Sequence, residues 1–139
     1  MLLTIATAQA STDVRVLEHL DAEAAIPVVS DRPALQGDVS VLPTPDANPA
    51  VTPMPARVDV VRGEAGGNTH SLHPMHGACM WDAHTPSGMS DLALGTLTVP
   101  LGSSALLAHP EHGFLQFAPG TYRIGRQREY AGEWAYVAD

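Results

Sequence analysis

The chain contains no lysine, a single cysteine and few charged residues. Its 139 residues include seven arginines and 15 acidic side chains, for a formal net charge of −8. Proteins that bind nucleic acid neutralise phosphates with clustered positive charge, so this composition disfavours a nucleic-acid partner. One arginine cluster exists, at Arg123, Arg126 and Arg128, and we interpret it as charges along an exposed strand face.

Two further scarcities exclude a disulfide and a membrane span. Cys79 has no second cysteine to pair with, and its neighbours Ala78 and Met80 suggest a small apolar residue rather than a nucleophile. No apolar run approaches the ~20 residues that cross a bilayer. The first ten residues end in Ala-x-Ala but lack a basic start, so we expect neither a secretory signal nor a membrane partner.

Aromatic residues are scarce before residue 114. Large rings dominate the energetics of cores and interfaces, so the C-terminal quarter is expected to anchor the fold. We predict that Phe114, Phe117, Tyr122 and Tyr130 form the main hydrophobic core. Trp134 and Tyr136 are expected to pack either on the chain's own core or on a neighbour.

Short apolar segments separated by glycine and proline predict the fold class. The expected strands span residues 36–43, 57–63, 92–101, 104–108, 113–118 and 120–128. This spacing predicts a mainly β fold, a small antiparallel sandwich or barrel with at most one or two short helices. In the last strand, Tyr122 and Ile124 should share one face, with Arg123 on the other.

The remaining chain divides into an arm and loops. Residues 1–34 are expected to form an extended N-terminal arm, and residues 35–139 the β domain. Within the arm we predict a strand over residues 2–9, followed by a helix capped by residues 11–13 or, alternatively, a strand over 14–20. Residues 43–57 hold five prolines and predict an extended, mobile Pro-rich loop, and residues 63–88 predict a further loop-rich region.

Histidines supply the one candidate site. His70, His73 and His76 are spaced by three, and His109-Pro110-Glu111-His112 is a second cluster. Imidazole and carboxylate groups bind zinc and other divalent metals, so His70, His109 and His112 could converge as in cupin-like sites, with Glu111 beside them. The favoured alternative is that these are loop histidines that bind backbone or face solvent.

Motifs for catalysis are missing from the sequence. No Gly-x-Ser-x-Gly, paired carboxylates or phosphate-cradling loop is present. We therefore expect a protein that is not an enzyme, with no catalytic residue and no cofactor apart from the divalent metal considered above.

Four motifs resemble those of a family of small bacterial and phage proteins. They are Gln36-Gly37-Asp38-Val39, Gly67-Asn68-Thr69-His70, His109-Pro110-Glu111-His112, and the stretch from Pro119-Gly120 to Arg126-Gln127-Arg128-Glu129-Tyr130. The resemblance covers roughly residues 35–139 and implies that residues 1–34 are an addition to a shared domain. Asn68 stands where the family usually has histidine, which implies one metal ligand fewer.

The small acidic β domain, its arm and its Pro-rich segment together favour a structural role in a phage virion. We expect a minor capsid or decoration protein, made in the host cytoplasm, that binds the major capsid protein and forms a homo-oligomer, a trimer being one candidate. The predicted partner-binding residues are Leu2, Leu3, Ile5, Pro45, Pro49, Pro53, Trp134 and Tyr136. The alternatives are a metal-binding cupin-like protein and a protein-binding accessory factor of a mobile element.

Overall fold

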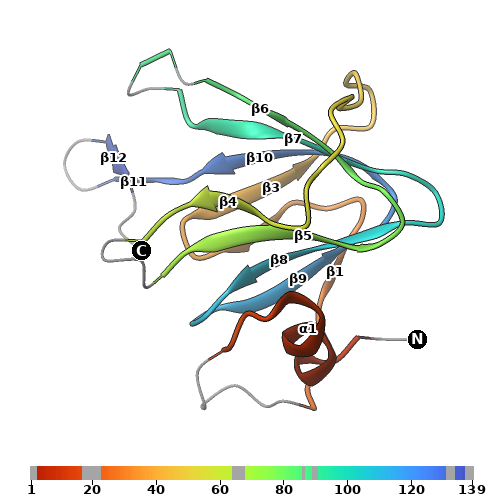
Figure 1. Ribbon diagram of the computed structural model, residues 1–139. Helices are drawn as coiled ribbons and strands as arrows, with labels where there is room; N and C mark the ends of the chain where they lie inside the picture. The colour runs from red at the N-terminus through yellow and green to blue at the C-terminus, as the bar shows by residue number, and fades with distance from the viewer. Residues whose placement is uncertain are drawn as a thin grey trace.

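The computed structural model describes residues 3–16, 23–63, 68–85, 87–88, 91–130 and 134–136. For residues 128–130 and 134–136 it describes the backbone alone. Two five-stranded sheets are stacked face to face, with one helix beneath them (Figure 1). The elements are α1 (Ile5–Thr12), β1 (Val28–Val29), β2 (Ala34–Gln36), β3 (Val39–Pro43), β4 (Val58–Val61), β5 (His70–His76), β6 (Met80–Ala83), β7 (Ala93–Val99), β8 (Ser104–His109), β9 (Gly113–Phe117), β10 (Gly120–Arg126), β11 (Arg128–Tyr130) and β12 (Trp134–Tyr136).

Sheet I has the order β2-β3-β10-β7-β6, and sheet II has the order β1-β9-β8-β5-β4. Their ladders are antiparallel except for β1 on β9, and β11 pairs with β12 separately. The fold is therefore an open sandwich, which confirms the predicted mainly β class. The two sheets do not close into the barrel that was the alternative. No helix in the described ranges is long and apolar enough to cross a bilayer.

The core between the sheets is built by alternation along the strands. In β10, Tyr122 and Ile124 are fully buried whereas Arg123 is exposed, as predicted. Phe117 meets Tyr122 edge to face with ring centroids 5.0 Å apart, and Cys79 is buried beside them as a small apolar residue. Phe114, in contrast, does not join this core, and the side chain of Tyr130 lies outside the described residues.

A second hydrophobic cluster covers the outer face of sheet II. Strand β8 is buried at every position, because Ala105 and Leu107 face the core while Leu106 and Ala108 face outward. The outward pair packs with Phe114 and with residues of the N-terminal arm, Ile5, Ala8, Val14 and Ile26. The run Ser104–His109 lacks the polar alternation of a half-exposed strand because both of its faces are covered.

The prediction of a strand over residues 2–9 is wrong, because this segment forms helix α1. Thr4 caps the helix by accepting the Thr7 N–H at 3.3 Å, and Asp13 ends it with φ 60° and an N–H bond of 2.9 Å to the Gln9 carbonyl. The alanines between these two caps favour helix over strand. Residues 13–16 have no regular structure, and the predicted elements at 17–22 lie outside the described residues.

The Pro-rich segment crosses the outer face of sheet I, and we call residues 43–57 the strap. Thr44 N–H binds the Thr121 carbonyl at 2.9 Å, and Ala50 N–H binds Thr98 Oγ1 at 2.8 Å. Further along, Thr52 and Met54 pair with the chain before and within β6, so the strap covers that edge of the sheet. A segment predicted to be a mobile loop thus has its N–H groups bonded to its own domain.

The predicted loop over residues 63–88 also needs correction, because it contains β5 and β6. Pro74 argued against a strand in this region, because proline removes a hydrogen bond from the ladder between strands. In the structure β4 pairs with β5 only as far as Leu72, so Pro74 lies where β5 has a single neighbour, β8. The register shifts between Pro74 and His76, which accommodates the missing donor.

Candidate functional site

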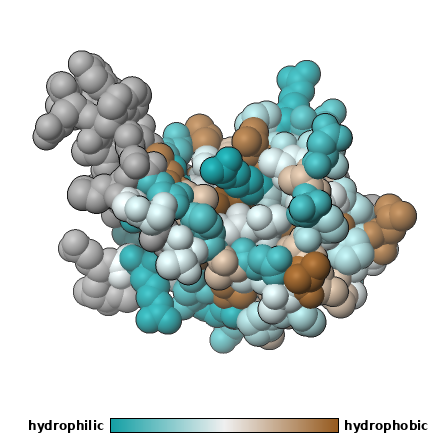
Figure 2. Space-filling view, turned by 90° about the horizontal axis from the view of Figure 1, so that it is seen from above, coloured by the Kyte–Doolittle hydropathy of each residue, from teal (hydrophilic) through white to brown (hydrophobic). Residues whose placement is uncertain are grey.

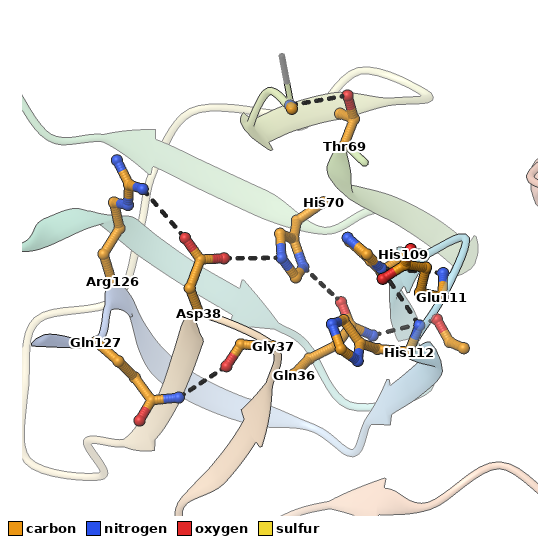
Figure 3. A network of polar contacts seen from close by, with 12 residues as sticks. Gln36, Gly37, Asp38, Thr69, His70, His109, Glu111, His112, Arg126 and Gln127 are labelled. Carbon is orange, nitrogen blue, oxygen red and sulfur yellow. Dashed lines mark hydrogen bonds and ion pairs between the residues drawn. The ribbon is translucent and has the colours of Figure 1, made fainter. Parts of the chain in front are cut away.

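A network of polar side chains is buried at one end of the sandwich, on the left of Figure 1. Gln36 ends β2, Asp38 lies in the following turn, His70 begins β5, His109 ends β8 and Arg126 ends β10. Gln36, Asp38, His70 and His109 are each at most 3% exposed. Figure 3 shows these side chains pointing toward one another, from the β2 turn and from the ends of three strands that are distant from it in sequence.

Hydrogen bonds fix the orientation of the Gln36 amide. Its Nε2 donates to the carbonyls of Leu107 and Gly113, at 2.9 and 3.2 Å. The Oε1 atom therefore faces Nδ1 of His70, 2.9 Å away, as an acceptor. Because an amide oxygen can only accept, His70 must carry a proton on Nδ1.

The second nitrogen of His70 also faces an acceptor. Nε2 lies 3.0 Å from Oδ1 of Asp38, and both side chains have no exposed surface. Oδ2 of the same carboxylate binds an Nη atom of Arg126 at 3.1 Å. Both ring nitrogens of His70 are thus hydrogen-bonded, and the Asp38 carboxyl group is shared between His70 and Arg126.

The turn around Asp38 is tied to the end of β10. Gln127 donates its backbone N–H to the Asp38 carbonyl and its side-chain amide to the Gly37 carbonyl, both at 2.8 Å. Gly37 has φ 56°, a left-handed conformation that glycine adopts at low cost. These bonds hold the carboxylate in register with His70 and Arg126.

His109 and His112 extend the network toward the surface as a row of tilted rings. The ring centroids of His70 and His109 are 4.2 Å apart, and those of His109 and His112 are 4.5 Å apart. Nδ1 of His109 accepts the backbone N–H groups of Glu111 and His112 at 3.1 and 3.2 Å, so it carries no proton. His112 and Glu111 are exposed.

The three histidines predicted as metal ligands do come together, but through their faces. Metal ligation needs ring nitrogens whose lone pairs converge on one point. Both nitrogens of His70 are hydrogen-bonded to other groups, and Nδ1 of His109 is occupied by two N–H donors. Across the described ranges, no set of three or more His, Cys, Asp or Glu side chains is arranged to hold a metal ion.

The sequence of residues 35–127 matches a family described as a domain of unknown function, DUF8820. The match covers most of the chain. The protein belongs to this family. No curated protein and no solved structure matches the chain. Every residue of the polar network lies inside the DUF8820 domain, whereas the arm lies before it.

The sequence does not predict that three members of the network contact the histidines, and it suggests Arg126 as a charge on an exposed strand face. Gln36, Asp38 and Arg126 belong to motifs that carried the resemblance, yet composition and spacing gave no reason to join them to the histidines. A signal existed: a buried imidazole needs partners for both nitrogens, and these DUF8820 motifs supply an amide and a carboxylate.

The other histidines of the DUF8820 domain lie apart from the network. His73 is 4% exposed, and burial, followed by the nearby Arg57, lowers its pKa to about 4. Its Nε2 lies 2.9 Å from Ser71 Oγ. His84 Nε2 binds the Asp91 carboxylate at 2.6 Å, and this bond is the main cause of the lowered pKa of Asp91.

The predicted partner-binding residues occupy different environments. Ile5 is only 8% exposed and packs on its own chain, as Leu3 does in part, so these two do not face a partner in this arrangement. Pro45, Pro49 and Pro53 are exposed on the strap. Leu2 and the side chains of Trp134 and Tyr136 lie outside the described residues.

Proposed function

We propose that this DUF8820 protein is a non-enzymatic structural protein of a phage virion, a minor capsid or decoration protein. It binds the major capsid protein and stabilises the head. One observation carries the proposal: the strap is fastened to sheet I and presents exposed prolines at an end of the sandwich that has few charged side chains. We call this end, opposite the polar network and on the right of Figure 1, the proline end.

The strap is rigid enough to serve as a docking element. The Asp82 carboxylate accepts the N–H groups of Val51 and Thr52 at 3.2 and 3.0 Å, and Thr98 Oγ1 accepts that of Ala50. Prolines need no such bonds and restrict the backbone further. Binding through a preformed surface costs less conformational entropy than binding through a mobile loop.

The proline end also has the composition of an interface core. Residues 47–56, 99–104 and 117–122 contain no charged side chain, although the chain as a whole is strongly acidic. Leu101, at the tip of the turn between β7 and β8, is 92% exposed, and Val51 on the strap is 77% exposed. Depletion of charge with exposed apolar groups is the signal that marks the centre of protein interfaces.

A hollow of about 240 Å³ opens at the same end, between Pro43, Pro45 and Pro119. On the face seen in Figure 2, hydrophobic residues form small separate groups among polar ones. We therefore expect the partner to meet several small apolar groups and this hollow rather than one continuous patch.

Particle purification tests the proposal. Phage particles are purified from cells that carry the gene, and their proteins are quantified by mass spectrometry. We expect the protein to co-purify with the major capsid protein at a constant ratio through density-gradient centrifugation. Its presence only in the soluble fraction, bound to another protein, would support the accessory-factor alternative and remove the virion proposal.

Cross-linking then locates the contact. Because the chain has no lysine, the reagent should be a dihydrazide that joins carboxylates. Asp31 and Asp46 border the proline end and should link to the capsid protein, whereas exposed Glu111 at the opposite end should not. Leu101→Asp should weaken binding to heads, and Leu35→Asp, an exposed leucine of β2, provides the matched control.

A further inference from the structure

We propose that the N-terminal arm is an exchangeable element, and that the arm of one copy seats on sheet II of a second copy. By the arm we mean residues 3–16 and 23–29, which precede the DUF8820 domain. This inference goes beyond the capsid proposal and does not depend on it. It assigns the partner surface to the edge of β9 and the outer face of β8.

The first observation is the way the arm joins the sheet. Strand β1 pairs with β9 in parallel, with Val28 opposite Gln116 and Val29 opposite Phe117, and it is the one parallel pair among the described strands. Gln116 N–H binds the Pro27 carbonyl and Ala118 N–H binds the Val29 carbonyl, both at 2.9 Å. Without the arm, β9 would be an open edge, which is the surface that β-strand addition uses.

The second observation is the apolar face beneath the helix. Leu106, Ala108 and Phe114 belong to the DUF8820 domain and point away from the core between the sheets. They are at most 3% exposed because Ile5, Ala8 and Ile26 of the arm cover them. The domain therefore contains a hydrophobic docking face whose cover is supplied by a segment outside the domain.

The third observation is the seam between arm and domain. A cavity of about 320 Å³ separates Ile5, Ile26 and Pro27 from Gln36 and His112. This pocket is partly open to solvent, so the side chains that line it make fewer contacts across the seam, which lowers the free energy needed to separate the two surfaces. The link that follows, residues 30–33, is exposed and ends in Pro33.

These observations favour a second copy as the occupant. An exchanged arm makes the same hydrogen bonds and apolar contacts that the structure shows, so only the link at residues 30–33 changes conformation. A foreign segment would need to match both the β9 edge and the face at Leu106. Exchange also provides the homo-oligomer expected from the sequence without any additional surface.

Two full-length variants test the exchange. Val28→Cys and Gln116→Cys place one thiol each at opposed positions of β1 and β9, and the native Cys79 is buried. One variant carries a mass tag, and the two are mixed at high concentration and oxidised. We expect a disulfide-linked heterodimer in several-fold excess over the homodimers that each variant forms alone.

The double variant Val28→Cys/Gln116→Cys is the matched control for geometry. At low concentration it should close within one chain, and covalent dimer should increase with the concentration before oxidation. Closure within the chain at every concentration, with no excess of heterodimer, would overturn the proposal. Failure of the double variant to close at all would also overturn it, because β1 would then not occupy this seat.

A measurement on the unaltered chain gives a result that does not depend on whether the variants fold. Unlabelled and ¹⁵N-labelled proteins are mixed and analysed by native mass spectrometry. We expect mixed dimers in statistical proportion, whereas monomer alone over the same concentration range would contradict exchange. A dimer that persists after Val29→Pro, which changes the β1 residue bonded to Ala118 and disturbs the seat, would assign the contact to another surface.

Discussion

Nε2 of His70 lies 3.0 Å from the carboxyl group of Asp38 in the interior of the sandwich, with neither side chain exposed to water. The other oxygen of Asp38 binds Arg126 at 3.1 Å, so one carboxyl group serves two basic side chains. Replacing a well-packed buried pair can be neutral, but removing one partner leaves the other without its hydrogen bond. The network is therefore most sensitive at Asp38.

We predict that Asp38→Asn destabilises the fold by about 3–5 kcal/mol, because buried His70 and partly exposed Arg126 lose the carboxyl group that they share. Urea denaturation followed by circular dichroism measures the change. Asp59→Asn is the control, since Asp59 pairs with Arg57 at 2.7 Å, both side chains are partly exposed at 27% and 47%, and exposed pairs contribute less than about 1 kcal/mol. Equal losses in the two variants would show that burial of Asp38 does not make its contacts more important than a surface pair.

A second prediction concerns the pH dependence of stability. The pKa of His73 is lowered to about 4 from 6.5, so the unfolded state binds a proton that the folded state refuses between these values. The free energy of unfolding therefore has its full value above pH 6.5 and decreases as the pH falls toward 4, by up to about 3 kcal/mol. His73→Gln should flatten the pH profile of the free energy of unfolding over this window. An unchanged slope would show that His73 is protonated in the folded state.

A third prediction addresses the strap. Asp82 accepts the N–H groups of Val51 and Thr52. The hydrogen bond from the Thr52 side chain is the main cause of the lowered pKa of Asp82, and the two N–H bonds lower it further. Asp82→Ala should increase hydrogen exchange at Val51 and Thr52 severalfold while the β10 amides stay protected. Asp46→Ala, on the same strap, is the control. Unchanged exchange in Asp82→Ala would mean that the strap is held by other contacts.

A fourth prediction distinguishes a metal site from a structural network. Elemental analysis should find no stoichiometric divalent metal, and added Zn²⁺ should not raise the midpoint of thermal unfolding. The reason is that three of the four ring nitrogens of His70 and His109 are already bonded. A Zn²⁺-dependent increase that disappears in His112→Ala would instead support the metal-binding alternative.

The sequence predicted the strands of the sandwich better than the chemistry of the site. Alternating burial in β10 follows from local pattern, and so does the turn at Pro119-Gly120 before it. The contact between the rings of His70 and His109 does not, because it depends on the register between β5 and β8, in which Ser71 faces Ala108. Whether neighbouring histidines present edges or faces is decided by that non-local pairing.

The arm and the strap show a second limit of sequence reasoning. A segment rich in Ala, Thr and Ile is compatible with strand or helix, and the caps at Thr4 and Asp13 decide between them. The strap lacks donors at its prolines, yet the N–H groups of Ala50 and Thr52 find acceptors on Thr98 and Asp82, at least 30 positions away. The caps of the arm lie within a short window of sequence, whereas the acceptors of the strap do not.

Strand β8 joins two hydrophobic clusters through consecutive residues, Leu106 on the arm side and Leu107 on the core side. Mutations at these neighbours should therefore have separable effects, one releasing the arm and the other loosening the sandwich. The presence of the arm also determines which residue types are expected on the outer face of β8. A DUF8820 relative that began at the domain boundary would leave positions 106, 108 and 114 in water, so polar residues there would identify the members of the family that have no arm.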